Sequence, residues 1–95
     1  MEFNANLSVA ISKQGSRFIA YSPALDISTS GATEAKAKSR FVELVHLFVE
    51  ELEAAGTTAE VLRELGWKKE GAKKPSWMPP VYKTEKVAVR VPIAA

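Results

Sequence analysis

Residues 18–40, FIAYSPALDISTSGATEAKAKSR, change from the two-residue period of a strand to the three-to-four-residue period of a helix. Aromatic and apolar residues alternate before Pro23, which interrupts the pattern because proline lacks the N–H that a central strand needs. A short strand is expected over residues 25–30. Gly31 then breaks it, and Thr33 is a favourable helix N-cap. A chain with this switch passes from a sheet to a helix within a few residues, which predicts an α+β fold.

Two further strands are expected before this switch. Residues 3–13 alternate between apolar and polar side chains, which predicts a strand with one buried face. Gln14 and Gly15 supply a turn, and residues 17–22 are rich in the aromatic and β-branched residues that favour strands. The first three strands should therefore form an antiparallel meander.

A long helix is expected between Thr33 and Gly56, where a glycine can adopt the left-handed conformation that ends many helices. Thr57 and Glu60 match a capping box, which predicts a second, short helix closed by Gly66. The long helix has one apolar stripe whose members recur at spacings of three and four. These are Ala37, Phe41, Leu44, Val45, Phe48 and Leu52.

The last part of the chain combines a predicted loop with a predicted strand. Residues 68–80, KKEGAKKPSWMPP, are basic and rich in proline, which predicts a loop. Residues 83–93 alternate again, so we expect a final strand that joins the sheet and lies near an edge because of Pro92. The predicted order is β-β-β-α-α-β, and residues 1–95 are expected to form a single domain.

The opening stretch resembles the HicB-like antitoxin family. Its members carry an aromatic-x-Ala-aromatic strand, a small residue with proline, a leucine, a serine-glycine-threonine step and an alanine-rich helix start. The resemblance covers about residues 5–66 and the last strand. The positions that carry it are Phe18, Ala20, Tyr21, Ser22, Pro23, Leu25, Ser30, Gly31, Thr33 and Ala37.

The resemblance implies a partial ribonuclease-H-like fold without nuclease activity. It also implies that the protein binds and neutralises a small basic HicA-type toxin that cleaves mRNA. Many members add a C-terminal domain that binds operator DNA. After Gly66 this chain has only the basic loop and the expected strand, so it resembles a stand-alone member without a DNA-binding C-terminal domain.

Few residues in the chain are suited to catalysis or metal binding. There is no cysteine, one aspartate (Asp26) and one histidine (His46), and no nucleotide-binding glycine motif. Two-metal nuclease chemistry needs several converging carboxylates, and most of the glutamates are expected on the solvent side of helices. We therefore expect no enzymatic activity, no cofactor and no metal, and a cytoplasmic protein without a membrane segment.

The charge distribution suggests a second hypothesis. Residues 1–65 contain six Lys and Arg against nine Asp and Glu, whereas residues 66–95 contain seven against two. Lysines beside aromatic rings can hold a phosphate backbone and stack bases, so this region is a candidate nucleic-acid site. The residues concerned are Trp67, Lys68, Lys69, Lys73 and Lys74. The alternative is that both tryptophans, Trp67 and Trp77, are packing anchors and that the lysines are solvated.

Binding of a protein partner is expected in the same region, because Trp and Met are enriched at interfaces. The candidate partner-binding residues are Trp77, Met78, Tyr82, Lys73 and Lys74. A homodimer or higher homo-oligomer is also expected. A small sheet leaves open edges, residues 87–93 are largely apolar on one side, and the long helix has apolar residues outside its main stripe.

Overall fold

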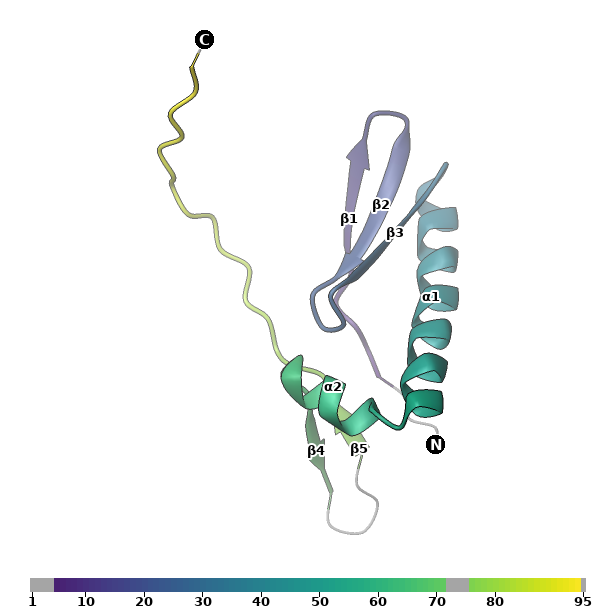
Figure 1. Cartoon of the computed structure of the whole chain (residues 1–95). Helices are drawn as coiled ribbons and strands as arrows, with labels where there is room; N and C mark the ends of the chain where they lie inside the picture. Colours follow the sequence, from purple (N-terminus) through teal and green to yellow (C-terminus); the bar gives the residue numbers. More distant parts are fainter. Residues whose placement is uncertain (1–4, 72–75, 95) are drawn as a thin grey trace.

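The computed structural model describes residues 5–71 and 76–94. Within these residues the chain forms three strands, two helices and then a two-stranded hairpin (Figure 1). The elements are β1 (Ala10–Gln14), β2 (Arg17–Ser22), β3 (Ile27–Gly31), α1 (Glu34–Ala55), α2 (Thr58–Glu64), β4 (Lys68–Glu70) and β5 (Ser76–Met78). The α+β class and the predicted order of three strands, a long helix, a short helix and a strand are confirmed.

Strands β1, β2 and β3 form an antiparallel meander with β2 in the centre. A two-residue turn joins Gln14 to Arg17, and its Gly15 has a φ of 62°, a conformation that glycine adopts without strain. The pairing places Ile11 beside Ala20 and Ala20 beside Thr29, on the face that α1 covers. The other face is largely polar.

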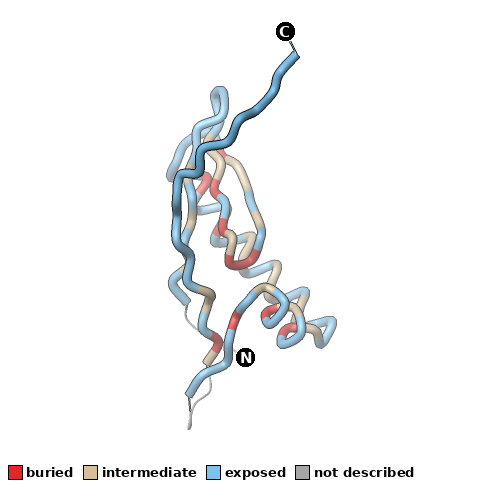
Figure 2. Tube along the Cα trace, turned by 90° about the vertical axis from the view of Figure 1, so that its left-hand side faces the viewer, coloured by how far each residue is buried: buried red, intermediate tan, exposed pale blue. Residues whose placement is uncertain are grey.

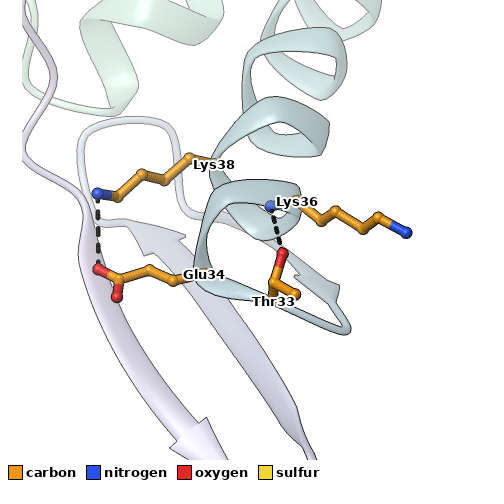
Figure 3. A network of polar contacts seen from close by, with 4 residues as sticks. All are labelled: Thr33, Glu34, Lys36 and Lys38. Carbon is orange, nitrogen blue, oxygen red and sulfur yellow. Dashed lines mark hydrogen bonds and ion pairs between the residues drawn. The ribbon is translucent and has the colours of Figure 1, made fainter.

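The passage from sheet to helix uses the residues that the sequence indicated. Thr33 is the N-cap of α1, and its Oγ1 accepts a hydrogen bond of 3.1 Å from the backbone N–H of Lys36 (Figure 3). Glu34 lies in the first turn, where its charge suits the helix dipole, and its Oε1 is 3.5 Å from Nζ of Lys38. Gly31 is needed for a different reason, because a Cβ there would lie 2.6 Å from the backbone nitrogen of Ala37.

The end of α1 and the start of α2 also follow the prediction, but the predicted capping hydrogen bond of α2 is absent. Gly56 ends α1 with a φ of 70°, and its N–H donates to the carbonyl of Glu53. Thr57 is the N-cap of α2 but makes no capping hydrogen bond through its side chain. The neighbouring Thr58 instead donates from Oγ1 to Oε1 of Glu53 at 2.9 Å, which ties α2 to the end of α1.

The core consists of two adjoining clusters (Figure 2). The sheet cluster is formed by Ala20, Ala37 and Phe41 where α1 crosses the strands. The tryptophan cluster joins the turn after β2, helix α2 and the hairpin, and consists of Ala24, Leu25, Leu62, Trp67 and Trp77. Leu7, Ile27 and Val45 pack against both clusters and so connect them.

The tryptophan cluster depends on one long-range hydrogen bond. Nε1 of Trp67 donates to the carbonyl of Ala24 at 2.7 Å, across 43 positions of the chain. This bond satisfies a buried carbonyl in the β2–β3 turn and fixes the segment after α2 against the sheet.

Two predictions about the C-terminal part are corrected. Residues 68–80 were expected to be a loop, but β4 and β5 pair in a second sheet, with Lys69 opposite Trp77. Residues 83–93 were expected to join the first sheet, but residues 79–94 have no regular secondary structure and extend away from it (Figure 1). A strand needs a partner for its backbone groups, and alternation alone does not supply one.

Two strands also begin later in the sequence than predicted. The first strand was expected over residues 3–13 but begins at Ala10, and residues 5–9 form no ladder. Leu7 and Val9 nevertheless pack against the core, so their alternation reflects one-sided burial rather than strand pairing. The third strand begins at Ile27 rather than at residue 25, because residues 23–26 form the turn that buries Ala24 and Leu25.

Neither helix in the described part of the chain has the length and apolar character needed to cross a membrane.

Replacing Gly31 by alanine should destabilise the fold by about 3 kcal/mol, because the new Cβ meets helix backbone that cannot move without shifting α1 on the sheet. Urea unfolding followed by circular dichroism would measure this. Gly15→Ala is the matched control, since it has open space around it and should cost only about 1 kcal/mol for its left-handed φ. Equal losses in the two variants would contradict the close-approach explanation.

Candidate protein-interaction surface

Both tryptophans proposed for partner or nucleic-acid contact belong to the core. Trp67 is 3% exposed and Trp77 is 2% exposed. Two cations lie by the Trp77 ring: the guanidinium of Arg63 and the ammonium of Lys69 are each 5.6 Å from the ring centre. Neither ring is open to a base or to a partner, which corrects the expectation for Trp67 and Trp77 and agrees with the packing-anchor alternative.

Of the remaining described residues of those two predictions, the pairing of β4 with β5 places Lys68 opposite Met78. Lys68 and Lys69 are exposed on β4, Met78 is exposed at the end of β5, and Tyr82 is exposed after the hairpin. Lys73 and Lys74 lie outside the described residues. Because both tryptophan rings are buried, Lys68 and Lys69 offer only charge to a phosphate backbone, and base stacking on Trp67 or Trp77 is not supported.

Asp26 has a structural role in the turn between β2 and β3. Its φ of 53° is left-handed, a conformation in which Asp and Asn are enriched among non-glycine residues. Tyr21 donates a hydrogen bond of 3.0 Å from its hydroxyl to Oδ1 of Asp26. This hydrogen bond, followed by a small desolvation and the charge of Asp26, raises the pKa of Tyr21 above its ordinary value.

Among residues 5–71 and 76–94, no three His, Cys, Asp or Glu side chains gather into a group that could hold a metal ion.

The surface with the most unusual chemistry lies on the C-terminal half of α1. Residues 41–55 contain four glutamates and no lysine or arginine, whereas all three basic residues of α1 lie before Phe41. We define the acidic face as five exposed residues on the solvent side of this half-helix. They are Glu43, His46, Leu47, Glu50 and Glu51.

Helix geometry places this face away from the sheet. Phe41 points into the sheet cluster, and Glu50, nine residues later, is turned by half a revolution from it. In Figure 1 no other described element covers the side of α1 opposite the sheet. Within the described residues, the four titratable side chains of the face make no side-chain hydrogen bond or ion pair. Leu47, 57% exposed, adds an apolar centre to the face.

The glutamates of this face oppose the helix dipole. The C-terminal end of a helix carries a partial negative charge, and cations there are favourable while anions are not. The last turn of α1 has no basic residue, and Glu50 and Glu51 lie within its last six positions. Because the effect falls off within the last turn and these two residues precede it, each of these carboxylates costs at most about 0.3 kcal/mol at low ionic strength. A local arrangement that reduces stability, with no compensating contact in the described fold, is typical of a functional surface.

The acidic face was not among the predicted site residues. The glutamates were interpreted singly, as solvated helix charges. The signal that identifies the face is the order of charges along α1, in which all lysines and arginines precede Phe41 and four of the five glutamates follow it.

No family model matches the chain, and searches of curated proteins and of solved structures find no significant match.

Replacing Asp26 by asparagine should lower the pKa of Tyr21 toward its ordinary value of about 10, because the charged acceptor is lost while the left-handed turn is kept. Spectrophotometric titration near 295 nm would measure it, with Tyr82→Phe in both proteins so that Tyr21 alone reports. A raised folded pKa stabilises the fold fully below the unfolded pKa and is lost as pH rises through the folded pKa. The stability difference between the two proteins should therefore shrink above about pH 10. An unchanged midpoint would show that the bond does not persist in solution.

Replacing Glu50 and Glu51 by glutamine should raise the free energy of unfolding by up to about 0.3 kcal/mol per site, because an unfavourable charge leaves the C-terminal half of the helix while helix propensity stays similar. Urea denaturation at low ionic strength would measure the change. Glu34→Gln is the matched control, since the same substitution at the favourable end should lower stability by a similar amount. A loss of stability in Glu50→Gln/Glu51→Gln would contradict the assignment.

Proposed function

We propose that this protein is a non-catalytic interaction module that neutralises a small basic toxin of the HicA type, which cleaves mRNA. The observation that carries the proposal is the acidic face of α1, which is exposed, unpaired within the described residues and unfavourable for the helix itself. The motif shared with HicB-like antitoxins supports the same class of function.

Charge complementarity explains why such a face suits an RNA-cleaving partner. A protein that binds RNA must present basic side chains to the phosphate backbone. Glu43, Glu50 and Glu51 offer carboxylates to those same basic side chains, and Leu47 offers an apolar contact at the centre of the patch. An antitoxin that occupies the toxin's RNA-binding surface inhibits it stoichiometrically and needs no chemistry of its own.

Met78 and Tyr82 remain secondary candidates for the same role. Both are more than two-fifths exposed, at 48% and 42%, and they flank the two prolines that follow β5. Exposed Met and Tyr side chains are favoured at interfaces because they bury much area and adapt to a partner. They do not belong to α1, which carries the acidic face. Replacing Met78 or Tyr82 by alanine therefore tests their contribution to partner binding separately from that of the acidic face.

The test is capture of the tagged full-length protein from its native host, with and without nuclease treatment, followed by mass spectrometry. A small basic protein should be recovered at near-equal stoichiometry and should resist nuclease. Once this partner is purified, Glu50→Gln/Glu51→Gln should weaken its binding about tenfold, equivalent to about 1.4 kcal/mol, although the variant itself is more stable. Glu34→Gln should bind as the wild type does.

Two results would contradict the proposal. One is recovery of nuclease-sensitive material alone, which would favour nucleic-acid binding through Lys68 and Lys69. The other is a basic partner whose RNA cleavage continues in the presence of excess protein, or whose affinity is unchanged by Glu50→Gln/Glu51→Gln.

A further inference from the structure

The C-terminal arm, residues 79–94, presents an unusual amount of apolar surface to solvent. Every residue from 81 to 94 is exposed, and its large hydrophobic side chains range from 98% exposed for Val81 to 42% for Tyr82. The large side chains alternate along an extended backbone, so that one side of the arm is apolar and the other is not. The apolar side carries Val87, Val89, Val91 and Ile93. A contiguous apolar row of this length marks an interaction site.

The root of the arm directs it away from its own sheet. Pro79 and Pro80 follow β5 directly, and consecutive prolines form a stiff, extended segment. Pro80 lies beside Gly66, because a Cβ built on this glycine would be 3.5 Å from the Cβ of Pro80, an ordinary contact distance. Figure 1 shows the arm leaving the hairpin and running apart from the three-stranded sheet. The radius of gyration, 16.4 Å, exceeds the value of about 12 Å expected for a compact chain of this length.

The sheet has an edge that matches the arm. Within the described residues no strand pairs with the outer side of β1, so its backbone N–H and C=O groups are available for a further strand. The opposite edge, β3, is partly protected. The guanidinium of Arg40 donates to the carbonyl of Ser30 at 3.1 Å, and α1 packs mainly over β3 and β2.

An apolar strip lies beside the β1 edge. Arg40 reaches β3 on one side of the buried Phe41, so Val42, one residue after Phe41, faces the β1 side of α1. Val42 is 54% exposed, and Val9 and Ile11 are only half-buried on the same face of the sheet. A fourth strand next to β1 with its apolar side toward α1 would cover this strip.

We propose that the arm of one copy adds as a fourth strand to the β1 edge of a second copy, giving a strand-exchanged homodimer. Residues 87–93 span about 20 Å when extended, which suffices to pair along β1. The exchange buries the apolar side of each arm, and a two-fold axis lets both copies contribute equally. Lys86, Arg90 and Pro92 then lie on the new edge strand, where charged side chains and proline prevent further addition.

The experiment compares the full-length protein with two variants that place the same charge on opposite sides of the arm. Val89→Asp puts a carboxylate on the apolar side, and Ala88→Asp puts it on the other side. Both residues lie in an exposed arm without regular structure, so neither variant should disturb α1 or the sheet, as circular dichroism will verify. Light scattering from 1 to 100 µM gives the mass, and amide hydrogen exchange at both ends of this range gives protection of residues 87–91.

We expect a dimer for the wild type and for Ala88→Asp. For Val89→Asp we expect a dimer dissociation constant at least tenfold higher, so that this variant is a monomer at low micromolar concentration. Protection of the arm and of Ile11 should fall on dilution. A monomeric wild type overturns the proposal. So does arm protection that is independent of concentration, which would show the arm folding onto its own sheet, or a Val89→Asp dimer as tight as the wild type.

Discussion

The hydrogen bond from the Trp67 indole to the Ala24 carbonyl holds the two halves of this molecule together. Among the described residues, the meander, α1 and α2 precede Trp67, and the hairpin and the arm follow it. The bond lies inside the tryptophan cluster, where an unpaired carbonyl would cost about 1–3 kcal/mol. Trp67 is fixed against the β2–β3 turn. It therefore positions the residues that follow it, which are the hairpin with Trp77 and the two prolines at the start of the arm.

The sequence predicts those elements whose cause is local. The period of α1, the N-cap Thr33 and the left-handed Gly56 are each encoded within a few residues, and the structure has them where expected. The hairpin of β4 and β5 was missed because lysine and proline disfavour strands, while Trp77 is recruited by distant core residues. For residues 83–93 a strand was predicted where the structure has none. Their alternation shows that the segment could pair as a strand, but it does not show which strand it would pair with.

The functional surface is harder to predict for a similar reason. Trp67 and Trp77 stand among lysines in the sequence, and nothing local distinguishes a ring that stacks on a base from one that fills a core. The structure distinguishes them through burial and through the cations of Arg63 and Lys69 beside Trp77. The acidic face of α1 is readable from sequence only when the direction of the helix is considered, because its glutamates are ordinary residues in an unfavourable order.

The division of the core into two clusters has a consequence for how the protein unfolds. Both tryptophans belong to one cluster, so intrinsic fluorescence reports on the hairpin and α2, whereas far-ultraviolet dichroism reports mainly on α1. Leu7, Ile27 and Val45 are the side chains shared between the clusters, and all three are only half-buried. Cooperative unfolding of the whole domain therefore depends on three side chains that are partly exposed to solvent. Coincidence of the two optical transitions measures whether those contacts couple the clusters into one folding unit.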